Sequence, residues 1–385
     1  MRLEDICTVF TDGDWIESKD QSESGIRLVQ TGNIGEGRYL EKEARAKYIS
    51  EETFYKLKCT EIFPGDILVS RLPEPVGRAC IVPEKTERMI TAVDCTICRP
   101  NESLISKEYL CYFMRSNAYY TRLLGNVTGT TRKRISRKNL GSVELQIPTK
   151  DEQKIVVERL DCLVKAIDSR TKELQLLDEL IKARFVELFG DPRSNPFGFE
   201  KKMLKDTCKV ITGNTPSRAI AEYYGDYIEW IKTDNIVSGI LNPTQAIESL
   251  SEKGMNVGRT VEKDSILMAC IAGSIASIGR VSITDRTVAF NQQINAVVPE
   301  QYNILFLYVL LQMSKDYLVE DINMALKGIL SKSKLEEKEF IIPPMDLQEQ
   351  FSDFVKQVDK SKVAVQKALD ETQLLFNSLM QEYFG

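Results

Sequence analysis

The chain has 385 residues, of which 43% are hydrophobic and 28% charged, and its formal net charge is −5 at pH 7. These values are typical of a globular protein with two or three domains. The chain contains no histidine, which excludes Ser-His-Asp and Cys-His catalysis and the histidine-ligated zinc enzymes. No run approaches the roughly 18 apolar residues that span a bilayer, and residues 1–5 lack the features of a signal peptide, so we expect a cytoplasmic protein without a membrane partner.

The sequence repeats itself at an offset of about 195 to 202 residues. The first positions of the repeat recur in order: Leu3, Asp5, Cys7, Val9 and Thr11 return as Leu204, Asp206, Cys208, Val210 and Thr212. A period of this length indicates a duplicated domain, because solenoid repeats are about 20 to 50 residues long. We therefore predict two related domains that grip one object at two places.

The first predicted domain covers residues 1–150. Short β-like runs alternate there with Gly and Pro breakers, and the strand candidates are residues 26–30, 66–70, 79–82 and 92–98. Apolar residues at helical spacing predict one helix over residues 106–124. The second domain, residues 191–344, repeats this plan with a helix near residues 304–318. Each copy is expected to be an α+β domain.

Cys95 and Cys98 are the only closely spaced pair among the nine cysteines. A Cys-x-x-Cys pair supplies half of a zinc site, but a tetrahedral site needs two further ligands. Because the pair lies in a strand-like stretch, we interpret both residues as buried thiols, and we expect no metal ligand on this chain.

The basic segment near the end of the first copy is the strongest candidate for DNA contact. Its cations are Arg132, Lys133, Arg134, Arg137 and Lys138. Such side chains, together with the hydroxyls of the preceding threonines, can follow a phosphate backbone. The second copy retains Lys327, Lys332 and Lys334. A solvated charged loop is the alternative interpretation.

Two repeated polar segments are candidates for contacts to bases. They contain Gln30, Thr31 and Asn33 in the first copy, and Lys232, Thr233 and Asn235 in the second. Asn and Gln can bond adenine with two hydrogen bonds, but Asn also caps turns, so a structural role fits equally well.

The segments that end at the repeated Gly-Arg pair differ between the copies. The first carries Arg71 and Arg78, whereas the second is small and apolar and carries Ser274 and Arg280. We include these four residues among the predicted DNA contacts. Because the linings differ, we expect the two copies to read different DNA sequences.

Long helical patterns follow the two domains, at residues 151–190 and 345–385. A heptad seam in the first helix comprises Val156, Leu160, Leu163, Ile167, Arg170, Leu174, Leu177, Ile181, Arg184 and Leu188. Adding 195 gives the seam of the second helix: Phe351, Val355, Val358, Lys362, Val365, Leu369, Thr372, Phe376, Leu379 and Tyr383. Such a seam needs a partner helix. We predict that the two helices pair as an antiparallel coiled coil; dimerisation and simple cover of the domain cores are the alternatives.

Signatures of catalysis are missing from the sequence. There is no phosphate-binding loop, no Gly-x-Gly-x-x-Gly, no His-Glu-x-x-His and no amino-methyltransferase motif. We therefore predict no catalytic residue. Two alternatives to DNA recognition are a coiled-coil scaffold that does not touch DNA, and a nuclease that uses Asp94 or Glu108 with Mg²⁺.

Three motifs of the second copy occur in a characteristic order. They are Val-Ile-Thr-Gly-Asn-Thr-Pro-Ser at residues 210–217, Phe-Asn-Gln-Gln-Ile-Asn at 290–295 and Ile-Pro-Pro-Met-Asp-Leu-Gln-Glu-Gln at 342–350. With a long helix after each domain, the whole chain resembles the specificity subunit of a type I restriction-modification system. The first copy departs from the motifs at residues 9–14 and 94–96.

The resemblance implies two target recognition domains, each of which binds one half of a split, asymmetric site on double-stranded DNA. It implies that the paired helices fix the gap between the halves. It further implies two modification subunits that hold S-adenosylmethionine and methylate adenine, and two restriction subunits that use ATP and Mg²⁺. This chain itself would hold no cofactor and would direct its partners to the DNA site.

Overall fold

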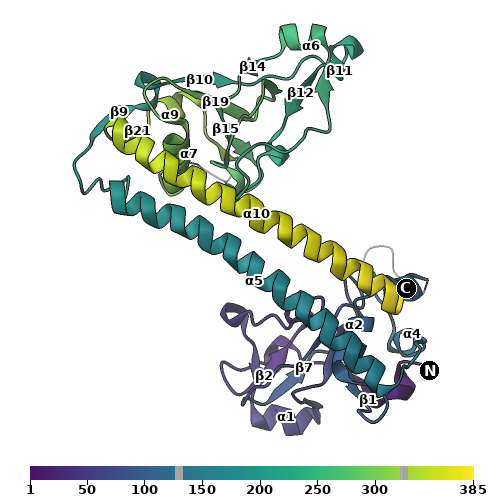
Figure 1. Ribbon diagram of the computed structural model, residues 1–385. Helices are drawn as coiled ribbons and strands as arrows, with labels where there is room; N and C mark the ends of the chain where they lie inside the picture. The colour runs from purple at the N-terminus through teal and green to yellow at the C-terminus, as the bar shows by residue number, and fades with distance from the viewer. Residues whose placement is uncertain (126–132, 321, 323–327) are drawn as a thin grey trace. The chain divides into compact units, whose positions relative to one another are not determined.

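The structure is a computed structural model that describes residues 1–125, 133–320, 322 and 328–385. It divides into two compact units (Figure 1). Unit 1 comprises Met1–Ser169 and Ala368–Gly385, and unit 2 comprises Arg170–Lys367. Each unit contains one α+β domain and segments of both long helices, α5 (Lys150–Phe189) and α10 (Met345–Phe384). The predicted fold class of two related α+β domains, each followed by a long helix, is confirmed.

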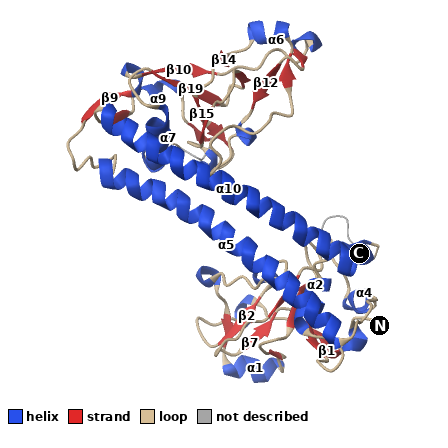
Figure 2. Cartoon of the chain, in the orientation of Figure 1, coloured by secondary structure: helices blue, strands red, loops and turns tan. Residues whose placement is uncertain are grey.

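Two four-stranded sheets form the centre of unit 1 (Figure 2). The first has the order β1-β8-β5-β6 and is antiparallel, with β1 (Cys7–Asp12), β8 (Cys95–Pro100), β5 (Ile67–Ser70) and β6 (Ala79–Ile81). The second has the order β3-β2-β7-β4, with β3 (Tyr48–Ile49), β2 (Ile26–Val29), β7 (Met89–Thr91) and β4 (Glu61–Ile62). Side chains alternate along β5: Ile67 and Val69 pack with helical residues, whereas Leu68 packs against the second sheet. The first sheet is therefore buried on both faces.

Unit 2 repeats this plan. Its first sheet has the order β10-β19-β15-β17, with β10 (Cys208–Thr212), β19 (Ile294–Pro299), β15 (Ile266–Ala269) and β17 (Val281–Ile283). Its second has the order β11-β13-β12-β18-β14, with β11 (Tyr224–Gly225), β13 (Ser249–Leu250), β12 (Ile228–Ile231), β18 (Val288–Phe290) and β14 (Thr260–Val261). In both units the second sheet contains one parallel pair, β2 with β7 and β12 with β18.

Short elements complete the two domains. Two further strand pairs lie in unit 2: β9 (Glu200–Met203) with β21 (Glu339–Ile342), and β16 (Ile271–Ala272) with β20 (Gly328–Ile329). The helices are α1 (Glu51–Leu57), α2 (Lys107–Phe113), α3 (Asn117–Leu124), α4 (Arg137–Gly141), α6 (Glu252–Val257), α7 (Ile304–Met313), α8 (Lys315–Val319) and α9 (Lys332–Glu336).

Two helices predicted as continuous are each broken by a serine. The helix predicted over residues 106–124 is two helices, because the Ser116 hydroxyl accepts a hydrogen bond from the Tyr119 amide and so caps α3. The helix predicted near residues 304–318 is likewise divided at Ser314, between α7 and α8. The strand predicted over residues 92–98 begins only at Cys95, because residues 89–91 form β7 in the other sheet.

A repeated glycine explains one part of the sequence repeat. A Cβ at Gly13 would lie 2.3 Å from the carbonyl oxygen of Thr91, and a Cβ at Gly213 would lie 2.2 Å from that of Asn291. Both contacts are too short for any side chain. The two glycines therefore mark the same close approach of backbone segments in the two domains.

The long helices pair in an antiparallel manner within each unit. In unit 1 the Arg159 guanidinium, near the start of α5, donates to the hydroxyl of Tyr383, near the end of α10, at 2.8 Å. In unit 2 the rings of Phe185, near the end of α5, and Phe351, near the start of α10, have centroids 5.6 Å apart. All twenty predicted seam positions are buried or partly buried. The predicted antiparallel pairing is confirmed.

A repeated glutamine fastens the start of each long helix to its domain. Gln153 is 1% exposed; its amide oxygen accepts from the Ser106 amide at 2.8 Å, and its amide nitrogen donates to the carbonyls of Leu104 and Pro148 at 3.0 Å each. Gln348 likewise accepts from the backbone before α7 and donates to the backbone before α10. These bonds make Gln153 and Gln348 equivalent positions of the two copies.

Replacement of Gln153 by leucine should destabilise the chain. The change leaves the Ser106 amide and two carbonyls buried without partners, so we expect the free energy of unfolding to fall by about 2 to 4 kcal/mol. Urea unfolding of the purified chain measures this. The matched control is Gln357→Leu at an exposed position of α10, where a change within about 0.5 kcal/mol is expected. Equal midpoints for the two variants would contradict the fastening role.

Candidate nucleic-acid interface

The asparagines of the repeated polar segments are inside their domains. Asn33 is 6% exposed and ends the short 3-10 helix Thr31–Asn33; its amide oxygen accepts from the Gln30 amide at 3.0 Å, and its amide nitrogen donates to the Leu40 carbonyl at 2.8 Å. Asn235 repeats the first bond with Lys232, also at 3.0 Å. Asn33 and Asn235 therefore have the structural, turn-capping role that is one of the two interpretations of the sequence.

The neighbours of these asparagines reach solvent. Gln30, Thr31, Lys232 and Thr233 are partly exposed. The Lys232 ammonium forms an ion pair with Glu248 and lies 5.1 Å from the Trp230 ring centroid. Contact between these four residues and DNA stays a prediction.

Arg78 organises a loop of unit 1. Its guanidinium donates to the carbonyls of Ile34 at 2.7 Å, Thr31 at 2.8 Å and Leu72 at 2.9 Å, and the residue is 9% exposed. These bonds direct Arg78 toward the protein and give it a folding role, and its predicted DNA contact stays a prediction. Its counterpart Arg280 is partly exposed and donates to the Ser277 hydroxyl at 2.9 Å.

The second copy presents small polar side chains beside Arg280. The hydroxyls of Ser274 and Ser277 lie 3.0 Å apart; Ser274 is exposed and Ser277 is partly exposed. These groups can donate to or accept from DNA, and the predicted contact of Ser274 stays a prediction.

The predicted basic segments lie next to helix starts. Ser136 caps α4 by accepting from the Asn139 amide at 3.1 Å, and Ser331 caps α9 by accepting from the Lys334 amide at 3.3 Å. The residue before each serine, Ile135 or Leu330, is buried. The predicted cations that the structure describes are all exposed: Lys133, Arg134, Arg137, Lys138, Lys332 and Lys334. Arg132 and Lys327 lie outside the described residues.

Unit 1 contains an arginine–aspartate cluster, defined as Asp12, Arg71, Asp94, Arg134 and Arg137. Asp12 lies 3.3 Å from Arg71 and 3.7 Å from Arg137, and Asp94 lies 3.0 Å from Arg134. Arg71 is 4% exposed, whereas the side chains of Arg134 and Arg137 are 46% and 48% exposed. Burial lowers the pKa of Arg71, and nearby Asp12 opposes that effect. The cluster therefore combines a buried anchor with two guanidinium groups at the surface.

Unit 2 has neutral polar groups in the corresponding place, and we name them the amide–hydroxyl cluster: Thr212, Thr215, Asn291, Gln292, Gln293 and Asn295. The Thr212 hydroxyl donates to the amide oxygen of Asn295 at 2.8 Å. The amide nitrogen of Asn291 donates to the amide oxygen of Gln293 at 3.2 Å. Thr215 and Gln292 also share a side-chain hydrogen bond. The repeat thus positions charged groups in one domain and hydroxyls and amides in the other.

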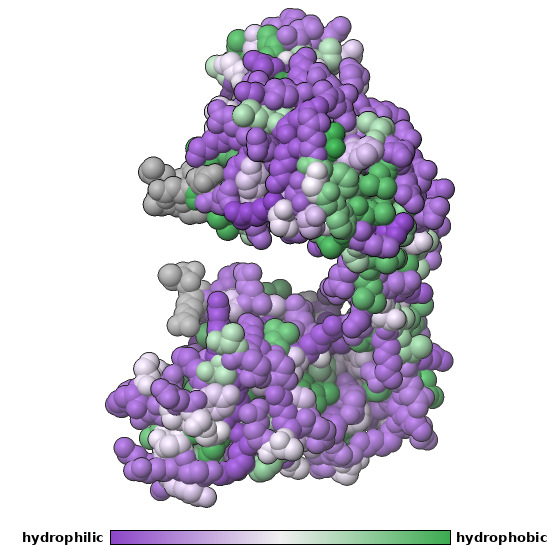
Figure 3. Space-filling view, turned by 90° about the vertical axis from the view of Figure 1, so that its left-hand side faces the viewer, coloured by the Kyte–Doolittle hydropathy of each residue, from purple (hydrophilic) through white to green (hydrophobic). Residues whose placement is uncertain are grey.

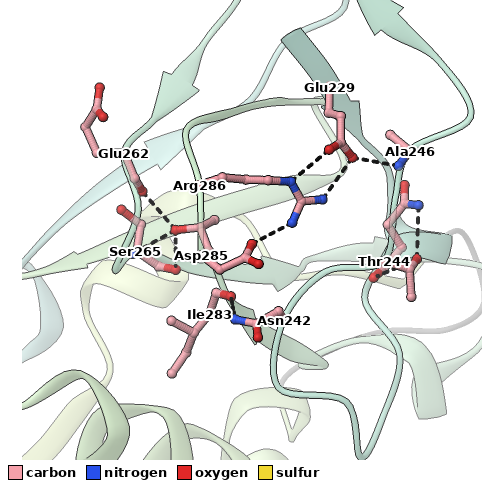
Figure 4. Close-up of polar contacts among 11 residues, drawn as sticks. Glu229, Asn242, Thr244, Ala246, Glu262, Ser265, Ile283, Asp285 and Arg286 are labelled. Carbon is pink, nitrogen blue, oxygen red and sulfur yellow. Dashed lines mark hydrogen bonds and ion pairs between the residues drawn. The ribbon is translucent and has the colours of Figure 1, made fainter.

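Other ion pairs stabilise loops away from these clusters. Arg286 donates to both carboxylate oxygens of Glu229, at 2.8 and 2.9 Å, and Glu229 also accepts from the Ala246 amide at 2.8 Å (Figure 4). The Arg286 guanidinium lowers the pKa of Glu229, while burial opposes the shift. The pair ties the loop around Ala246 to the turn that carries Arg286, which is a structural role.

Cys95 and Cys98 are both fully buried in β8. Burial raises the pKa of Cys95 to about 12, and it also raises that of Cys98, so both are protonated thiols at neutral pH. The interpretation of the pair as buried thiols is confirmed. Within residues 1–125, 133–320, 322 and 328–385, no cluster of three or more Cys, Asp or Glu residues is arranged to hold a metal ion.

The surface of each unit is largely hydrophilic on the face drawn in Figure 3. Over the described part of the chain, none of the helices combines the length and the apolar character needed to cross a membrane.

Comparison with known proteins identifies the family. Residues 1–179 and 196–372 each match the model of the type I restriction modification DNA specificity domain. The chain belongs to this family. Two curated relatives are the specificity subunits of the type I restriction enzymes HindI from Haemophilus influenzae and MjaIX from Methanocaldococcus jannaschii. They are 23% and 24% identical, over 74% and 80% of this chain and 77% and 74% of their own length.

Solved structures share the fold over the whole chain. The S subunit of a type I system from M. genitalium matches with a TM-score of 0.60 at 14% identity, covering 100% of this chain and 95% of its own. A chain from a structure of type I complex assembly and conformational transition matches with a TM-score of 0.58 at 16% identity, covering 100% and 96%. These structures show the fold, and the family match shows the function, which is recognition of a DNA sequence within a restriction-modification complex.

Removal of the Asn33 side chain should destabilise the fold, and this tests whether Asn33 has a structural role or contacts DNA directly. Asn33→Ala loses the bonds to the Gln30 amide and the Leu40 carbonyl, so we expect the free energy of unfolding to fall by about 1 to 3 kcal/mol. Gln30→Ala, at a partly exposed neighbour, should change it by about 0.5 kcal/mol or less. Thermal unfolding of both variants measures the difference. A stable Asn33→Ala variant that binds DNA poorly would instead make Asn33 a direct reader.

Proposed function

We propose that this chain is a non-catalytic specificity subunit whose two domains each bind one half of a split, asymmetric site on double-stranded DNA. The observation that carries the proposal is the contrast between the arginine–aspartate cluster and the amide–hydroxyl cluster at corresponding places of two repeated domains. Charged and neutral polar groups favour different base edges. Two domains with different chemistry on one chain therefore suit two different half-sites.

Exposed cations would supply the affinity for the phosphate backbone. Four lysines are exposed: Lys133 shortly before α4, Lys138 in α4, and Lys332 and Lys334 in α9. Contacts of this kind position a protein on DNA without reading its sequence. The remaining predicted contacts that reach solvent would then supply the specificity; they include Gln30, Thr31, Lys232, Thr233, Ser274 and Arg280.

The partners would supply the chemistry. We assign methylation of adenine to two modification subunits that hold S-adenosylmethionine, and cleavage to two restriction subunits that use ATP and Mg²⁺. This chain would carry no cofactor and would bring both kinds of subunit to the DNA site. Membership in a DNA specificity family does not favour the non-DNA scaffold or the nuclease that uses Asp94 or Glu108.

The paired helices would set the gap between the half-sites. In both units, seam residues of α5 and α10 are buried or partly buried, so their packing resists sliding of one helix along the other. Each residue of a helix contributes about 1.5 Å of length. The number of residues in α5 and α10 would then control the spacing.

Neutralising two exposed lysines should reduce the salt dependence of DNA binding. Each phosphate contact contributes about 0.9 to the slope of log K against log salt concentration. We therefore expect Lys133→Gln with Lys138→Gln to reduce the slope by about 1.8, with no change in the sequence bound. Titration of duplex DNA with the chain and its modification partner measures this.

The matched control for this titration is Lys154→Gln with Lys356→Gln, at exposed positions of the long helices. Its slope should equal that of the wild type. A wild-type complex without any salt slope would contradict DNA binding and would favour the scaffold.

Deletion of one heptad from both long helices should shorten the gap between the half-sites. Seven residues correspond to about 10 Å of helix, or roughly three base pairs. Methylome sequencing of a host that carries the variant should find each half-site unchanged and the gap shorter by about three base pairs. An unchanged gap in a methylating variant would contradict the proposed control of spacing.

A further inference from the structure

The two domains share a backbone framework around their polar clusters. The Arg71 amide donates to the Asp94 carbonyl at 2.9 Å, and the Cys270 amide donates to the Gln293 carbonyl at 2.8 Å. The next bond is also repeated, since Ile135 donates to the carbonyl of Arg71 at 3.2 Å, and Leu330 to that of Cys270 at 2.9 Å. These bonds make Arg71 equivalent to Cys270, and Asp94 equivalent to Gln293.

The side chains on this framework differ in charge. Asp94 carries a carboxylate that is 28% exposed and paired with Arg134 at 3.0 Å. Gln293 carries a neutral amide, is partly exposed, and accepts from Asn291 at 3.2 Å. One backbone position of the repeat therefore presents a carboxylate paired with a guanidinium in unit 1, and an amide bonded to a second amide in unit 2.

The fold does not require the charges of unit 1. Cys270 is buried at the place of Arg71 and makes the same backbone bonds without any ionised group. The buried Nε of Arg71 has no hydrogen-bond partner among the described residues. Burial of an incompletely bonded guanidinium is unfavourable. Since the neutral version of this framework folds in the same chain, the charges need a reason other than stability.

We infer that Asp94 and Gln293 are equivalent specificity-determining residues. Asp94, together with Arg134, reads a G·C pair in the half-site of the first domain. Gln293, positioned by the buried Asn291, reads an A·T pair in the half-site of the second. This inference rests on the proposed recognition of a split site and assigns base chemistry to each half.

The donors and acceptors of these side chains match the two kinds of base pair. In the major groove, guanine offers two acceptors to an arginine, and cytosine offers an amino donor to a carboxylate. The Arg134–Asp94 pair presents both complements side by side. Adenine offers one acceptor and one donor, which a single amide such as that of Gln293 can satisfy together. A carboxylate cannot do so, because it only accepts.

The test exchanges the two side chains. Asp94→Gln and Gln293→Asp are each expressed with the modification subunits, and the methylated DNA sites are compared with those of the wild type. Asp94→Gln should change the preference at one G·C position of the first half-site by about tenfold or more, and leave the second half-site and the gap unchanged. Gln293→Asp should change one A·T position of the second half-site only. Glu84→Gln, at an exposed acid of unit 1, should leave both halves unchanged.

The outcomes separate this inference from the proposed function. A wild-type complex that methylates no defined split sequence would refute the proposed function itself. A defined wild-type site would retain that function, and an unchanged sequence after both exchanges would overturn the inference. Equal loss of methylation at all sites, with a lower unfolding temperature, would assign the Asp94–Arg134 pair to stability and would also overturn it.

A third variant tests the same base position in case Asp94→Gln fails to fold. Arg134→Gln removes the exposed partner of Asp94 and leaves the buried Arg71 in place. It should relax the same position of the first half-site that Asp94→Gln alters. A change at another position, or in the other half-site, would contradict the shared reading of one base pair.

Discussion

Each domain depends on an aromatic contact with the long helix of the other copy. In unit 1, Phe384 at the end of α10 lies 5.1 Å from Tyr109 and 6.3 Å from Phe113, measured between ring centroids. In unit 2, Phe189 at the end of α5 lies 4.8 Å from Phe306. These rings are buried, so neither core is complete without a segment from the other half of the sequence. The duplicated domains therefore fold as parts of one chain.

Because each helix end packs against a domain as well as against the partner helix, the long helices carry two apolar faces at their ends. The heptad seam predicts the side that meets the partner helix, and it ends with Leu188 and Tyr383. Phe189 and Phe384 lie one position further along, on the side that meets the sheet and helices of a domain. The heptad pattern of the sequence predicts the pairing of the helices. The pattern does not predict the contacts of Phe189 and Phe384 with the domains, because those contacts depend on which surface lies beside each helix end.

The sequence predicted the large elements because their signals are local and periodic. It missed the breaks at Ser116 and Ser314, since a serine within an apolar helical pattern is compatible with a continuous helix. Ser116 caps the following helix with its hydroxyl, whereas Ser314 makes no side-chain cap bond. The polar residues of the candidate site were harder to assign. Asn33 and Arg78 have the composition of DNA contacts, but they are bonded to backbone groups that lie apart in sequence. Only the tertiary structure distinguishes such bonding from exposure.

The duplication makes the chain its own comparison between framework and lining. Gly13 and Gly213, and Gln153 and Gln348, occupy matching places where geometry or buried bonding leaves little choice. Arg71 and Cys270 are buried at equivalent positions of the two copies and make the same backbone bonds. This position therefore accepts very different side chains without a change in the backbone. Positions of the second kind can vary without loss of the fold. A recognition protein needs such freedom, because a new target then requires new side chains and not a new framework.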